Sequence, residues 1–165
     1  MIITHYTKPI HIRNILSSGE LKLEGCNFDE DQLKTYVKLR AGIRLLWFTE
    51  SKNCNTAKPI YTDQFGNFIE FVPNLNQIGF QFDSEEIKAI RWEEWCRPRK
   101  IFEKKKLAIN ILNTKAININ DDPRDFWVLE SPISLNYCKS YVVCDPKGQV
   151  KKIKLEEILS YYRLP

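Results

Sequence analysis

The sequence lacks the features that mark membrane-spanning and exported proteins. No apolar run approaches the roughly 20 residues that a transmembrane helix needs. Residues 1–5 have neither the charged start nor the long apolar stretch of a secretory signal peptide. We therefore expect a cytoplasmic protein with no membrane partner.

Metal ligands are also scarce. The chain has two histidines, His5 and His11, and five cysteines, none of them in a CxxC pair. A zinc site needs a close cluster of such side chains, so we expect no metal ion. The odd number of scattered cysteines favours reduced thiols in a reducing compartment.

Several nucleotide-binding and hydrolase motifs are absent as well. The sequence contains no GxxxxGK[ST], GxGxxG, GxSxG or HExxH motif, which argues against kinase-like, Rossmann and α/β-hydrolase proteins. No internal repeat appears, so a solenoid is excluded. What remains is a chain of 165 residues, 43% of them hydrophobic, which is enough to bury one core. We expect residues 1–165 to form a single domain.

Hydrophobic periodicity predicts a mixture of strands and helices. The patterns indicate strands at 2–6, 20–24, 43–49, 68–72, 78–82, 126–130, 140–144 and 150–154. They indicate helices at 9–18, 29–40, 83–97, 98–113 and 155–163, a loop at 50–66 and a turn at 145–148. This order favours an α+β fold with a mostly antiparallel sheet.

Two clusters combine aromatic and polar side chains at predicted strand ends. His5-Tyr6-Thr7 closes the first strand, where a histidine can bind ribose hydroxyls or simply the backbone. Trp47-Phe48-Thr49 precedes short polar residues that include Asn55 and Thr56. Such a group suits a flat heteroaromatic ligand, and it equally suits a core aromatic followed by turns.

A third cluster places an acid beside an apolar strand. Glu130 follows Phe126 to Leu129 and precedes Ser131-Pro132. An unpaired charge is costly there, and both active-site carboxylates and turn-capping carboxylates occupy such positions. We weakly favour a functional role for Glu130.

A fourth cluster interleaves arginine and tryptophan. Arg91, Trp92, Arg97 and Arg99 lie in a stretch where indoles could stack on bases and guanidinium groups could contact phosphates. Arginines that pack on indoles within the fold would produce the same pattern. The net charge of +4 permits nucleic-acid binding without requiring it. These four residues are the candidate nucleic-acid contacts.

The order of these blocks resembles the ADP-ribosyltransferase-like superfamily of the histidine–tyrosine–glutamate type. His5-Tyr6-Thr7, with a helix that ends near Gly19, is similar to its opening motif. Residues 46–49 with 55–57 resemble the second motif, and residues 125–135 around Glu130 resemble the third. Small bacterial proteins share this order of blocks. The resemblance implies an ADP-ribosyltransferase-like split antiparallel β-sheet core flanked by helices.

The same resemblance implies NAD as the substrate and no metal. By position, His5 would hold the NAD ribose and Glu130 would be the catalytic acid. The remaining implied NAD-binding residues are Tyr6, Thr7, Trp47, Phe48, Thr49, Asn55 and Thr56. The superfamily more often has a tyrosine in the second motif. Since this chain has Trp47 and Phe48 there instead, the two are equally eligible to stack on nicotinamide. Many members of the superfamily carry a second acid or a glutamine two residues before the catalytic glutamate. This chain has Val128 at that position, which argues against an arginine-directed protein modifier.

We therefore expect an NAD-dependent mono-ADP-ribosyltransferase in a toxin or phage–host conflict role. DNA or RNA is the expected acceptor, and an antitoxin or host protein is the expected partner. An RNA 2′-phosphotransferase on the same fold is a second hypothesis, although neither motif carries evident basic residues for a phosphate. A non-catalytic module that binds NAD or nucleic acid is a third. Nicotinamide release from NAD distinguishes the first hypothesis from the third.

Overall fold

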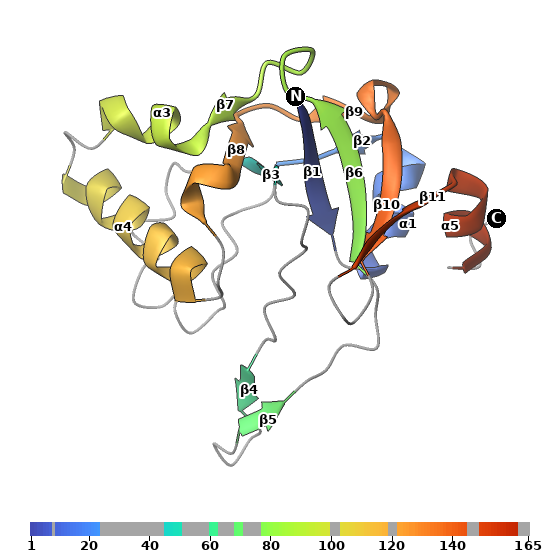
Figure 1. The fold of residues 1–165 in the computed structure, drawn as a ribbon, viewed down its shortest axis with the longest axis horizontal. Coiled ribbons are helices and arrows are strands. Elements are labelled where there is room, and N and C mark those ends of the chain that lie inside the picture. The colour runs from blue at the N-terminus through green and yellow to red at the C-terminus, as the bar shows by residue number, and fades with distance from the viewer. Residues whose placement is uncertain are drawn as a thin grey trace.

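The structure of the protein is a computed structural model. It describes residues 1–7, 9–23, 45–50, 60–62, 68–70, 77–99, 103–118, 122–144 and 149–161. These residues form helices and a mostly antiparallel sheet (Figure 1), which confirms the expected α+β class. The expected helix at 29–40 and the expected turn at 145–148 lie outside the described residues, as do Asn55 and Thr56.

The described chain contains strands of two to seven residues and helices of varied length. The strands are β1 (Ile2–Thr7), β2 (Glu20–Leu21), β3 (Leu46–Thr49), β4 (Ile60–Thr62), β5 (Phe68–Glu70), β6 (Gln77–Asp83), β7 (Ile90–Arg91), β8 (Phe126–Leu129), β9 (Ile133–Ser134), β10 (Ser140–Cys144) and β11 (Val150–Ile153). The α-helices are α1 (Pro9–Ser18), α3 (Trp92–Cys96), α4 (Glu103–Asn118) and α5 (Leu155–Tyr161), and the 3-10 helices are η1 (Arg97–Arg99), η2 (Pro123–Asp125) and η3 (Leu135–Tyr137).

Seven strands form the main sheet in the order β11-β10-β6-β1-β3-β8-β7. Every neighbouring pair in it is antiparallel. Since β1 and β8 both run antiparallel to β3, their C-terminal ends lie at the same end of the sheet. Two small ladders, β2 with β9 and β4 with β5, lie outside this sheet.

The sheet separates two hydrophobic cores, because successive side chains of a strand point to opposite faces. The main core packs against α1 and α5, and the second core packs against α3 and α4, so helices lie on both sides of the sheet in Figure 1. The main core includes Ile3, Ile12, Phe48, Phe80, Phe82 and Ile158. The second core includes Leu45, Trp92, Trp95, Cys96, Ile109 and Val128.

Local sequence signals account for the first helix. Pro9 begins α1, where its fixed backbone angle suits a helix start and its missing N–H costs little. Gly19 ends it with a φ of 68° and donates its N–H to the Ile15 carbonyl at 3.0 Å. A glycine adopts that left-handed angle without the strain of a Cβ.

The predicted helix at 83–97 is wrong in its first half. Asp83 does cap a turn, since its Oδ1 accepts the N–H of Glu85 at 2.9 Å. The chain makes this turn but does not continue as a helix, because Lys88 adopts a φ of 56° and Ala89 donates its N–H back to the Ser84 carbonyl. The chain then enters β7, and α3 begins only at Trp92.

Other boundaries shift by smaller amounts. The helix predicted at 98–113 becomes η1 followed by α4, which begins at Glu103 and ends at Asn118. The predicted strand at 20–24 is two residues long, and the predicted loop at 50–66 contains β4. The sequence patterns missed β9, which pairs with β2.

One expectation about cysteine is wrong. Cys144 is disulfide-bonded, whereas Cys96 and Cys138 carry free thiols. The partner of Cys144 is not among the described residues, and the expectation of reduced thiols throughout the chain is corrected at this position. Within the described segments, no helix is both long and apolar enough to cross a membrane. Among the described residues, no three potential metal ligands lie close enough together to hold an ion.

Candidate functional site

The backbone ladder between β1 and β3 is short. All of β1, from Ile2 to Thr7, pairs with β6, whereas the ladder of β1 with β3 contains the pair Thr4 opposite Thr49. The C-terminal half of β1 therefore lies outside this ladder, at the end of the sheet where β1 and β8 finish and β3 begins.

His5 connects β1 and β3 beyond the Thr4–Thr49 pair. Its Nδ1 lies 2.8 Å from the carbonyl oxygen of Trp47 on β3. Because a carbonyl can only accept, Nδ1 must carry the proton in this contact. The imidazole also lies edge-on to Phe48, with ring centroids 5.8 Å apart. A side-chain bond thus replaces the backbone pairing that stops after Thr4.

Tyr6 leaves β1 on the opposite face from His5. Burial raises the pKa of Tyr6, and a side-chain hydrogen bond with Thr4 opposes that rise. Gly79 on β6 faces them, and a Cβ there would lie 2.7 Å from Thr4 Cγ2 and 2.8 Å from Tyr6 Cε1. The absence of a side chain at Gly79 therefore allows Tyr6 to lie flat across β6. Thr7, also half-buried, ends the strand.

A polar network that sequence patterns did not indicate continues across this face. Gln81 on β6 donates to the Thr4 hydroxyl at 3.4 Å and accepts from the Ser140 hydroxyl at 2.6 Å. These residues lie on three adjacent strands and are 59 and 77 positions apart in the sequence. No local pattern reports such a contact, so only the strand order brings them together.

The second sequence block is divided between the two cores. Phe48 is 2% exposed and packs edge-on against Phe82 at 5.7 Å, which makes it a residue of the main core. Trp47 points the other way, with its ring 4.7 Å from Trp92 and 6.0 Å from Phe126. Trp47 is half-buried, so it keeps the greater access to a ligand. The prediction that Trp47 and Phe48 are equally able to stack on nicotinamide is therefore wrong, because Phe48 has no exposed face on which nicotinamide could stack.

Glu130 lies directly after β8, beside the start of β3, because Leu129 pairs with Leu46. Its Oε1 accepts the Trp95 indole N–H at 2.7 Å and a guanidinium N–H of Arg99 at 2.8 Å. The carboxylate is thus paired, as its position at the end of an apolar strand requires. Its side chain is nevertheless 56% exposed.

The structure brings His5 and Glu130 to the same end of the sheet but not to the same face. Phe48, which contacts His5, belongs to the main core, whereas Trp95, which binds Glu130, belongs to the second core. The alternation along β8 agrees, since Leu129 packs against the main core. The two side chains could therefore act on one ligand only if that ligand crossed the end of the sheet.

Three of the four candidate nucleic-acid contacts, Trp92, Arg99 and Arg91, form hydrogen bonds to other residues of the fold. Trp92 is 2% exposed and donates its indole N–H to Asn113 at 2.7 Å, so it is corrected to a core residue that cannot stack on a base. Arg99 lies over the Trp95 ring at 4.0 Å and bonds to Glu130. Arg97 is exposed. The arginine–tryptophan pattern therefore mainly reflects packing, which was the alternative explanation.

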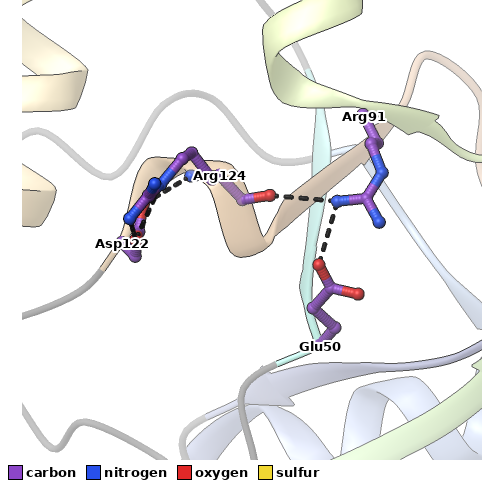
Figure 2. Close-up of polar contacts among 4 residues, drawn as sticks. All are labelled: Glu50, Arg91, Asp122 and Arg124. Carbon is purple, nitrogen blue, oxygen red and sulfur yellow. Dashed lines mark hydrogen bonds and ion pairs between the residues drawn. The ribbon is translucent and has the colours of Figure 1, made fainter.

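The fourth of these residues, Arg91, joins the opposite end of β3 to η2. Figure 2 shows its guanidinium between Glu50 and the backbone of Arg124, with distances of 2.9 Å to Glu50 Oε1 and 3.2 Å to the Arg124 carbonyl. The same guanidinium lies 4.5 Å from the centroid of the Trp127 ring. Arg91 thus links the residue after β3 to η2 through Nη1 and packs on Trp127, and these contacts stabilise the sheet edge.

A second pair in Figure 2 stabilises η2. Asp122 accepts the backbone N–H of Arg124 at 2.9 Å and also pairs with the Arg124 guanidinium. The side-chain hydrogen bond from Arg124, followed by the backbone bond, lowers the pKa of Asp122 from 3.8 to about 2. This is the behaviour of an N-cap carboxylate.

Two residues of the site, Trp95 and Arg99, were missed as partners of Glu130. Their spacing of four residues was the available signal, because such spacing places two side chains on one helix face, but the predicted helices at 83–97 and 98–113 separated them. Their target on β8 could not be read from the sequence. Comparison of the chain with protein-family models, with curated proteins and with solved structures finds no match.

Proposed function

We propose that the protein is an NAD-dependent mono-ADP-ribosyltransferase in which Glu130 is the catalytic carboxylate. The observation that carries this proposal is the position of Glu130: exposed over 56% of its side chain, held by two hydrogen bonds, and located directly after β8 beside the start of β3. The described parts of the three blocks that resemble the superfamily include the strands β1, β3 and β8, which follow one another in the sheet. The blocks of His5 and Glu130 thus lie on the two strands that flank β3.

The chemistry requires a fixed negative charge. The bond between nicotinamide nitrogen and ribose C1′ breaks, and nicotinamide leaves with the bonding electrons. An acceptor nucleophile then bonds to C1′ and loses its proton. Positive charge develops on the ribose during this step, and a preorganised carboxylate stabilises it. Glu130 has the required restraint, because Trp95 and Arg99 orient it before any substrate binds.

The roles of the other residues differ in this proposal. Trp47, half-buried on β3, is the proposed aromatic contact of nicotinamide. His5 is proposed to hold the NAD ribose near the C-terminal end of β1, where its Nδ1 bond to β3 fixes the ring. Glu130 does not need to share a face with His5 if the nucleotide crosses the end of the sheet.

One observation favours a second candidate function. The positive charge of Arg99, at 2.8 Å, offsets the charge of Glu130, as it would in a purely structural ion pair. A module that binds NAD or nucleic acid without turnover would tolerate such a pair. Measurement of turnover and of binding therefore has to be made together.

The deciding experiment measures nicotinamide release from NAD by the wild-type protein and by Glu130→Gln, with and without DNA or RNA. We expect Glu130→Gln to lower the rate by about 10²–10³-fold, as for the loss of other preorganised electrostatic groups. Glu86→Gln is the matched control, because Glu86 is an exposed carboxylate paired with Lys139 elsewhere on the molecule.

The outcomes separate the two candidates. Stimulation of release by one polymer would identify the acceptor class. NAD binding without release, from a folded wild-type protein, would contradict the transferase and support the binding module.

A further inference from the structure

Both side-chain hydrogen bonds that Glu130 accepts are made to the same carboxylate oxygen. The Trp95 indole and the Arg99 guanidinium both donate to Oε1, at 2.7 Å and 2.8 Å. Within the described part of the chain, no hydrogen bond or ion pair ends on Oε2. An exposed carboxylate held in this way cannot rotate freely, yet it keeps a complete oxygen for another donor.

The first donor, Trp95, is held rigidly by the second core. Its side chain is 4% exposed, and its ring stacks on Trp92 with centroids 5.2 Å apart and planes inclined by 14°. Trp92 is in turn fixed by its bond to Asn113. A donor buried this well has a defined direction, because core side chains occupy fixed rotamers.

The second donor, Arg99, is fixed by the first. Its Nη1 donates to the Trp95 carbonyl at 2.8 Å while Nη2 donates to Glu130, and its guanidinium lies 4.0 Å from the Trp95 ring centroid. The planar fork of arginine allows both bonds at once, which the single ammonium of lysine cannot reproduce. Trp95, Arg99 and Glu130 therefore form a closed set of contacts.

We infer that Trp95 and Arg99 are positioning residues, which hold Glu130 through Oε1 and present Oε2 to the ribose side of a bound nucleotide. The catalytic part of this inference rests on the proposed transferase function. In it, the two residues act through Glu130 and do not touch the substrate. Their removal should impair the reaction step more than substrate binding, because the carboxylate remains present but loses its orientation.

The first arm of the test measures kcat and KM for nicotinamide release. Trp95→Phe keeps an aromatic ring in the core and removes the N–H. Arg99→Lys keeps the charge and removes the fork. We expect each to lower kcat by about tenfold and to change KM by less than about twofold, since one oriented hydrogen bond to a charged group has roughly that worth.

Trp127→Phe is the matched control. It makes the same chemical change in an indole that packs against the main core and whose buried N–H has no hydrogen-bond partner among the described residues. We expect a loss of thermal stability and an unchanged kcat. A merely structural role of Trp95 would make the two variants alike in both measurements.

The second arm needs no activity. The chain has four tryptophans, so its proton–nitrogen NMR spectrum contains four indole signals, and Trp95→Phe identifies one of them. We expect Glu130→Gln to shift the Trp95 indole signal and to leave in place the Trp127 signal, which Trp127→Phe identifies. An unchanged Trp95 signal in that variant would overturn the anchor itself.

The two arms keep the failures distinct. Equal kcat values for Trp95→Phe and Trp127→Phe, in an active protein, would overturn the positioning role and leave the transferase standing. Absence of nicotinamide release from the wild-type protein would overturn the transferase and the catalytic role of Trp95 and Arg99. The indole signal would then still decide whether the anchor exists in solution.

Discussion

Asp122 shows at the scale of one residue how a local contact makes stability depend on pH. Its carboxylate caps η2 and pairs with Arg124, which lowers its pKa from 3.8 to about 2. A group whose pKa falls on folding stabilises the folded state at pH values above its unfolded pKa. That contribution is lost as the pH falls from about 4 through about 2.

Replacement of Asp122 by asparagine tests this contribution. Asn keeps a capping oxygen for the Arg124 N–H but cannot carry the charge. We expect Asp122→Asn to lower the free energy of unfolding slightly at neutral pH and to flatten its fall between pH 4 and pH 2. Urea denaturation at several pH values measures both effects. An acid limb identical to that of the wild type would show that the pair contributes nothing, as many exposed pairs do.

At the scale of elements, a side-chain hydrogen bond contributes to the junction of β1 and β3. The contacts across this junction include the Thr4–Thr49 pair and the His5–Trp47 hydrogen bond. His5→Phe keeps an aromatic ring beside Phe48 and removes the donor. We expect it to lower the free energy of unfolding by about 1–2 kcal/mol, because the Trp47 carbonyl loses its partner.

His5→Asn is the variant that separates the bond from the ring. The amide nitrogen of asparagine can donate from nearly the position of Nδ1. We expect it to recover part of the stability that His5→Phe loses, as measured by urea denaturation. Equal losses in the two variants would mean that ring packing, and not the hydrogen bond, secures the junction.

For the whole molecule, the sheet makes the two cores energetically separate. Ile158 on α5 and Ile109 on α4 are both fully buried, the first in the main core and the second in the second core. We expect Ile158→Ala to cost about 2–5 kcal/mol and Ile109→Val about 0.5–1.5 kcal/mol. Because the two cores lie on opposite sides of the sheet, the double variant should lose the sum to within about 0.5 kcal/mol.

A double-mutant cycle by chemical denaturation measures this additivity. A coupling energy well above about 0.5 kcal/mol would show that the sheet transmits strain between the cores. Additivity would also mean that changes under α3 and α4 affect the surroundings of Glu130 without loosening α1 and α5.

The sequence alone determined the features that depend on neighbouring residues. Pro9 and Gly19 delimit α1, and the apolar pattern at 140–144 corresponds to β10. Alternation and capping act over a few residues, so they can be read without the fold. The same local rules overextended the helix after Asp83, because a cap stabilises a single turn as well as a helix.

Tertiary structure decided what each functional candidate contacts. The partners of Glu130 lie 31 and 35 residues away, and the carbonyl that binds His5 lies 42 residues away. It also decided that Phe48 and Trp92 are core residues while Trp47 keeps some exposure. The physical reason is that strand order and packing choose among partners of equal local propensity, and burial assigns each aromatic side chain to the interior or to the site.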